Sequence, residues 1–149
     1  ARLFKTKVEK LLEIIKPVVI SGNFKANTLS QGTLLGLIGE AYLKINELDS
    51  ALKYSSWGLR IPEKNKWPYI YYVLAKTHLD KKDYEKSLDY IHTGLPFIKA
   101  SKREKNIAQV YACAANDYFG LNKETLKYRC RSGSIIENKK FEICFSLNY

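Results

Sequence analysis

The side chains that could do chemistry are few, and their spacings do not match those of known catalytic or metal sites. His78 and His92 are the only histidines and belong to no HExxH motif, so they give no zinc-binding pattern. Asp80 and Asp83 flank a polar break, where carboxylates commonly cap a helix or meet solvent. Paired residues for acid–base catalysis are therefore not indicated.

The glycines and cysteines point to packing rather than to a reaction. The spacing of Gly32, Gly36 and Gly39 suits close approach of a helix, and the sequence contains no Gly-rich phosphate loop and no GxSxG motif. The cysteines are odd in number and form no CxxC pair, which favours isolated thiols in a reducing compartment: Cys113, Cys130 and Cys144. We expect no catalysis, no metal and no cofactor, and a cytoplasmic location.

Composition is that of a single globular domain with a surplus of positive charge. The chain has 149 residues, of which 46% are hydrophobic, and no apolar run is long enough to span a bilayer, so we expect no membrane contact. It contains no methionine, from which we expect a fragment of a larger protein. The net charge of +10 is concentrated towards the two ends and favours an acidic partner.

One phrase occurs twice and indicates the architecture. "ALKYSSWGL" at 51–59 returns as "SLDYIHTGL" at 87–95, a period of 36 residues, and a further step back reaches Gly22. Each copy follows a segment with apolar residues three and four positions apart, "LLGLIGEAYLKI" and "YIYYVLAKTHL", which predicts a helix. Polar breaks separate the two segments, so each unit is predicted to be helix, turn, helix.

These residues resemble the tetratricopeptide repeat family, whose signature combines a large residue, Leu-Gly, Tyr and a later Ala. The first copy matches it with Leu35, Ile38-Gly39, Tyr42 and Ala51. The second matches it with Tyr71, Leu74-Ala75, His78 and Ser87. The chain departs from the pattern at Ser55, where a large aromatic residue is expected, and in its period of 36 rather than 34 residues.

The resemblance implies an all-α, right-handed superhelix of about seven helices in antiparallel pairs. We expect a flanking helix and then three repeats and a cap, at 1–31, 32–65, 66–101, 102–133 (a divergent third repeat) and 134–149. Pro17 should break or kink the first helix, and Ser101 with Glu104 predicts a capping box at the start of the third repeat.

The resemblance also implies a function, which is binding a peptide or protein segment in a groove lined by the first helix of each repeat. The inward positions are Leu35, Ile38, Tyr42, Leu74 and His78. The remaining faces give the candidate groove: Gly36, Glu40, Leu43, Lys44, Tyr69, Tyr72, Lys76 and Leu79, with Val110, Ala114 and Asp117 from the third repeat. Alternatively, some of these tyrosines only pack between repeats. A partner with apolar and acidic residues would suit the aromatic and cationic side chains.

Two other functions stay open on the sequence. The C-terminal part gathers basic residues that could bind RNA or DNA phosphates in a salt-dependent manner: Arg129, Arg131, Lys139 and Lys140. Lysine far outnumbers arginine in the chain, which argues against specific base recognition. The chain could also be the regulatory part of a larger bacterial regulator or secretion protein.

Overall fold

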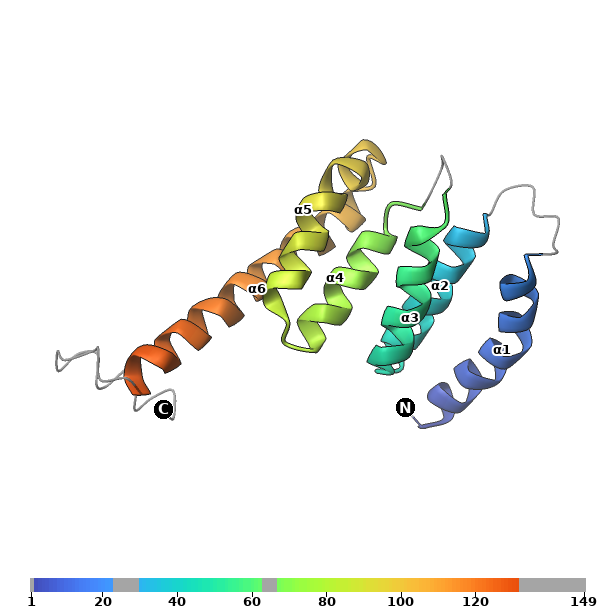
Figure 1. Ribbon diagram of the computed structural model, residues 1–149, viewed down its shortest axis with the longest axis horizontal. Helices are drawn as coiled ribbons and strands as arrows, with labels where there is room; N and C mark the ends of the chain where they lie inside the picture. The colour runs from blue at the N-terminus through green and yellow to red at the C-terminus, as the bar shows by residue number, and fades with distance from the viewer. Residues whose placement is uncertain (1, 23–29, 63–66, 132–149) are drawn as a thin grey trace.

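The computed structural model describes residues 2–22, 30–62 and 67–131, with side chains through Thr125, and these ranges are almost entirely helical. Six helices follow one another: α1 (Arg2–Ser21), α2 (Gln31–Lys44), α3 (Leu48–Arg60), α4 (Ile70–Asp80), α5 (Tyr84–Ala100) and α6 (Glu104–Arg131). They form a row that runs from α1 at one end to α6 at the other (Figure 1). Each helix packs on the next, and α2, α4 and α6 also pack in succession. The all-α prediction is confirmed for the described residues.

The 36-residue period appears in the structure as two equivalent turns. Asn46 joins α2 to α3 and Lys82 joins α4 to α5, and both have φ of 62°. The residue that follows each of them, Glu47 or Asp83, donates its amide to the carbonyl five positions earlier, at 2.9 and 2.8 Å. These turns close each helical pair, as the polar breaks in the sequence predict.

Stacked rings at the same period join the two helices of each pair. Tyr42 lies on Tyr54 with ring centres 5.4 Å apart, and His78 lies on Tyr90 at 5.5 Å. Burial lowers the pKa of His78, so its ring is neutral at pH 7 and packs as an aromatic side chain. The prediction that His78 is a packed core histidine is confirmed.

The repeated Gly-Leu phrase marks the place where the second helix of each pair crosses the first. A Cβ atom on Gly58 of α3 would lie 2.5 Å from the carbonyl oxygen of Gly32 in α2. A Cβ atom on Gly94 of α5 would overlap the side chain of Tyr71 in α4. Both glycines are therefore needed for close approach rather than for an unusual backbone conformation.

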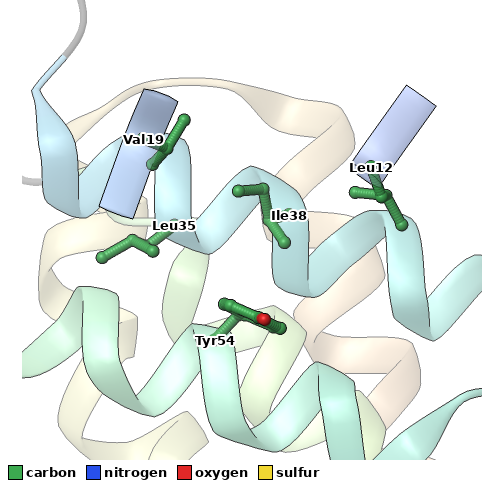
Figure 2. Packing of buried hydrophobic residues seen from close by; sticks show 5 residues of the cluster. All are labelled: Leu12, Val19, Leu35, Ile38 and Tyr54. Carbon is green, nitrogen blue, oxygen red and sulfur yellow. The ribbon is translucent and has the colours of Figure 1, made fainter. Parts of the chain in front are cut away.

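The hydrophobic core continues from α1 into the first pair. Figure 2 shows Leu12 and Val19 of α1 next to Leu35 and Ile38 of α2, with Tyr54 of α3 on the other side. A second cluster lies between α4, α5 and α6, and its buried members are Ala75, Ile91, Ile98, Val110 and Cys113. Leu35, Ile38 and Leu74 are buried as predicted for inward positions.

The prolines interrupt less than the sequence predicts. Pro17 lies inside α1, which continues to Ser21, and Pro96 lies inside α5, which continues to Ala100. Of the break or kink predicted at Pro17, the break is wrong, because α1 runs without interruption from Arg2 to Ser21. Four residues follow each proline within its helix, so the lost amide donor affects one hydrogen bond near the helix end and packing outweighs it.

The third repeat is the main departure from the prediction. α6 is a single helix through Arg131, so the helical pair expected within 102–133 is absent. Ser101 does not form the predicted capping box, because its hydroxyl donates to the Ile98 carbonyl at 2.6 Å and closes α5 instead. The predicted cap at 134–149 lies outside the described residues.

The close crossing of α2 and α3 yields a stability prediction. A Cβ atom on Gly39 would overlap the Ser55 hydroxyl and come within 3.0 Å of the Ala51 carbonyl. Ser55 is fully buried and stands where the family pattern has a large aromatic residue, for which this crossing leaves no room. We expect Gly39→Ala to lower the free energy of unfolding by about 1–3 kcal/mol and Gly39→Leu to lower it further.

Adding Ser55→Ala to Gly39→Ala should restore part of the loss, because it removes the oxygen that the new methyl group meets. Urea unfolding of the two single variants and the double variant measures this coupling. Additive effects of the two changes would show that the helices do not meet at this pair.

Candidate binding cavity

A cavity of about 430 Å³ lies along the first helices of successive pairs. Its walls come from α2, α4 and the start of α6, together with Trp67 before α4 and Arg103 before α6. The lining residues are Glu40, Leu43, Lys44, Trp67, Tyr69, Tyr72, Lys76, Asp80, Arg103, Lys105, Asn106 and Gln109. This volume falls within the usual range for sites that hold a small ligand or a few side chains.

Three aromatic rings form one wall. Trp67 and Tyr69 have centroids 5.1 Å apart, and Tyr69 and Tyr72 stack at 4.7 Å. The Tyr69 hydroxyl donates to Oε1 of Gln109 at 3.0 Å, which ties α4 to α6. Burial raises the pKa of both tyrosines, so both phenols stay protonated and can donate hydrogen bonds. The wall is thus a pre-ordered aromatic surface with polar tips.

The charges around the cavity are partly paired. Lys76 contacts Asp80 at 2.5 Å, and Lys44 contacts Glu40 at 3.6 Å, each one turn apart on its helix. Arg103 and Lys105 are exposed on the α6 side and have no ion-pair partner among the described residues. The cavity therefore has a positive edge and a nearly neutral opposite side.

Six of the eight residues that the sequence proposes for the first two repeats line this cavity. They are Glu40, Leu43, Lys44, Tyr69, Tyr72 and Lys76. Gly36, another of the eight, is buried next to Ile70 and Trp67 and does not line the cavity. Leu79 lines a different hollow, of about 500 Å³, between the α4–α5 turn and α6. Tyr69 is only 9% exposed, so it supports the wall more than it presents itself to a partner.

The residues that the sequence proposes for the groove from the third repeat are wrong, because the cavity is lined by neighbouring positions of α6 instead. Val110 and Asp117 are fully buried and face α5 rather than the cavity, and Ala114 packs on the same core. Asn106 and Gln109 line the cavity instead. The sequence comparison between repeats assumed that this region forms two helices joined by a turn. In the structure α6 continues as one helix, so the assumed side of the helix does not face the cavity.

Several lining residues were not among the candidates. Trp67 follows the first pair and begins "WPYIYY", an aromatic run that could have drawn attention to it. Arg103 and Lys105 precede or begin α6, and only the packing of α6 on α4 brings them to the cavity. Of the predicted basic face, the side chains of Arg129 and Arg131, and Lys139 and Lys140 entirely, lie outside the described residues.

A buried polar cluster lies between α5 and α6 and consists of Ser87, Cys113 and Asp117. The Ser87 hydroxyl donates to Oδ2 of Asp117 at 2.6 Å and lies 3.7 Å from the Cys113 sulfur. Burial raises the pKa of Cys113 to about 11, so the thiol stays protonated and is a poor nucleophile. All three side chains are closed to solvent, which makes the cluster a packing feature.

Other site types are not seen in the described part of the chain. Across residues 2–22, 30–62 and 67–131, no group of three His, Cys, Asp or Glu residues could hold a metal ion. In the same ranges, no helix has both the length and the apolar character needed to cross a membrane.

Comparison with known proteins gives no relative from which a function could be transferred. No family model matches the chain, and neither a characterised protein nor a solved structure matches it.

The buried carboxyl group leads to a pH prediction. Burial raises the pKa of Asp117, and its Oδ1 has no hydrogen-bond partner among the described residues. The native state therefore binds this proton more tightly than the unfolded chain does, and Asp117 lowers stability at neutral pH. The loss of stability caused by charged Asp117 becomes smaller as the pH falls through the raised pKa of the native state. It vanishes below the ordinary pKa of an aspartate in the unfolded chain.

We expect Asp117→Asn to raise the free energy of unfolding at pH 7 by about 1 kcal/mol, because it removes a buried charge while keeping an acceptor for Ser87. At acid pH, below the unfolded-state pKa, the variant and the wild type should be equally stable. Thermal unfolding between about pH 3 and pH 8, a range that extends below the ordinary aspartate pKa of about 3.9, tests this, and a variant that is less stable at every pH would contradict it.

Proposed function

We propose that this chain is a protein-interaction module of the tetratricopeptide-repeat type, which binds a segment of a partner protein in the cavity between α2, α4 and α6. The observation that carries the proposal is the meeting, at this one cavity, of the residues that the repeat pattern assigns to a binding groove. The two equivalent turns and the two equivalent ring stacks at a period of 36 residues support the repeat assignment.

The cavity chemistry indicates the partner segment. Tyr72 and Leu43 offer aromatic and apolar area, which suits an apolar or aromatic side chain. Arg103 and Lys105 have no ion pair within the part of the chain that the structure describes, and they can bind carboxylates at the edge. A short segment that combines an apolar anchor with nearby acidic residues fits both features. Gly36 and Glu40 occupy positions where some family members carry the Lys and Asn of a carboxylate clamp, so a partner's C-terminal carboxylate is not required.

A binding role fits this cavity better than a catalytic one. The titratable groups at its edge are ion-paired, as in Lys76–Asp80, or fully exposed. Its tyrosines have pKa values raised by burial, which makes them weaker acids and gives no base near neutral pH.

Identification of the partner is the first experiment. The chain is immobilised, bound proteins are recovered at moderate salt, and each is expressed and measured by titration calorimetry. We expect Tyr72→Ala to weaken the affinity by about 2 kcal/mol, roughly thirtyfold, because it removes the accessible part of the aromatic wall. Tyr69 is not truncated, because it is buried and bonded to Gln109, so its loss would open the core.

The Tyr72→Ala result is read with circular dichroism and a melting curve, and Tyr72→Phe serves as the matched control that keeps the ring. Undiminished affinity in a folded Tyr72→Ala variant would exclude the cavity as the binding site. If Tyr72→Ala melts, the charge variant described next provides the test, because its two side chains are exposed.

Reversal of the positive edge gives a separate prediction. Arg103→Glu with Lys105→Glu should slow association with an acidic partner by about tenfold at low salt and less at high salt, as measured by stopped-flow fluorescence. Lys99→Glu with Lys102→Glu is the matched control, because it makes the same charge change on exposed residues that do not line the cavity. Equal effects of the two pairs would mean that only net charge matters.

A separate measurement distinguishes protein binding from the alternative function, which is nucleic-acid binding. A salt titration on random single-stranded RNA and on duplex DNA measures any binding through phosphates. Nucleic-acid affinity that exceeds partner affinity at moderate salt would replace the protein-binding proposal.

A further inference from the structure

The first helix exposes apolar side chains that take no part in the core formed by the described residues. Six large apolar side chains, between 44% and 71% exposed, make up what we call the outer face of α1: Leu3, Phe4, Leu11, Ile14, Ile15 and Val18. Their spacings of three, four and seven residues place them on one side of the helix. Leu12 and Val19 lie on the other side and are buried against α2 (Figure 2). Contiguous exposed apolar surface of this kind marks an interaction site.

The repeat geometry shows what would cover such a face. The second helices α3 and α5 each pack on the helix before them and on the helix after them. α1 occupies one end of the row (Figure 1) and packs on helices that follow it, on α2 and, through Lys16, on the Tyr54 ring of α3. Its outer face is therefore the side on which the described residues supply no neighbour.

The sequence period supports the same equivalence. Ile15 and Val18 precede Ala51 and Tyr54 by 36 residues. Ala51 and Tyr54 are the residues through which α3 meets α2, by the backbone approach at Gly39 and by the ring stack. Ile15 and Val18 of the outer face are thus equivalent to the α3 residues that pack against the first helix of their pair, α2.

Charge selects the kind of helix that fits. Lys7 lies between Phe4 and Leu11 on this side, and Lys10 lies one turn before Ile14. Both lysines are exposed and have no ion-pair partner among the described residues. The carboxylate of Glu9 points to the other side, where it pairs with Lys5 at 3.9 Å. Glu13 acts electrostatically on Lys16, which lies over the Tyr42 and Tyr54 rings on the buried side. The apolar face therefore carries Lys7 within it and Lys10 beside it, and no ion pair neutralises either lysine among the described residues.

We propose that the outer face of α1 docks an amphipathic helix of another protein whose apolar stripe is flanked by glutamate or aspartate. The helix would take the place of a first repeat helix next to α1, and its carboxylates would pair with Lys7 and Lys10. A second copy of this chain fits less well, because it would bring two lysine-bearing faces together. This surface is separate from the cavity, so the two proposals can fail independently.

The probe is a synthetic, fluorescently labelled helical peptide of about 20 residues, matched to the length of α1, with leucine at heptad a and d positions and glutamate beside them. A second peptide carries lysine in place of each glutamate. Fluorescence anisotropy with the full chain should show at least about tenfold tighter binding of the acidic peptide at low salt. Equal binding of the two peptides, or no binding of the acidic one, overturns the proposal.

Variants locate the site. Leu11→Gln with Ile14→Gln should weaken acidic-peptide binding by about tenfold or more, without loss of helicity, because both side chains are exposed. Phe119→Gln, which removes an equally exposed apolar side chain on α6, should have no effect and is the matched control. Unchanged peptide binding in the α1 variant overturns the assignment of the surface.

Two further measurements distinguish other occupants. Sedimentation equilibrium reveals a dimer if a second copy covers the face, and co-sedimentation with phosphatidylglycerol vesicles reveals a lipid surface. A dimer, or vesicle binding stronger than peptide binding, that is lost in the Leu11→Gln, Ile14→Gln variant would overturn the proposal in favour of that occupant. The affinity of the cavity partner should be the same for this variant and the wild type.

Discussion

The rest of the structure depends on how closely the two helices of each pair approach. Gly39 meets Ser55 and Ala51 where α2 crosses α3, and Gly94 meets Tyr71 where α5 crosses α4. At such points even a methyl group would overlap a neighbouring atom, so the helices cannot be packed in another register without loss of contact. Once these crossings are set, the aromatic stacks and the turns at the 36-residue period fall into equivalent places.

This packing decides which side of each first helix is left for a partner. The inward residues of α2 and α4 are used against α3 and α5, and the remaining side forms the wall of the cavity. The Tyr69 hydroxyl donates a hydrogen bond to Gln109 of α6, so this wall of the cavity is held in place by a contact between two elements. A cavity held in this way loses little conformational entropy when a partner segment binds.

Positive side chains that could bind a partner's carboxylates lie beside the cavity and on α1. The middle of the chain pairs many of its lysines, as in Lys76 with Asp80 and Lys81 with Asp49 at 2.6 Å. Cations without an ion-pair partner in the described ranges lie beside the cavity, on Arg103 and Lys105, and at the outer face of α1, on Lys7 and Lys10. Both surfaces combine apolar area with positive charge, which selects partners that are apolar and acidic.

The sequence by itself determined the helical class, the pairing of α2 with α3 and of α4 with α5, the turns within these pairs and three of the inward positions, Leu35, Ile38 and Leu74. These features follow from side-chain periodicity and from turn residues that act within a few positions. Only the tertiary structure decided the course and register of α6, because these depend on contacts with a distant helix, such as Ser87 with Asp117 and Gly120 against Tyr84. For the same reason the sequence could name most of the α2 and α4 residues at the cavity but not those that α6 brings to it. A local pattern specifies which side of a helix is apolar, whereas the partner against which that side packs is chosen by long-range fit.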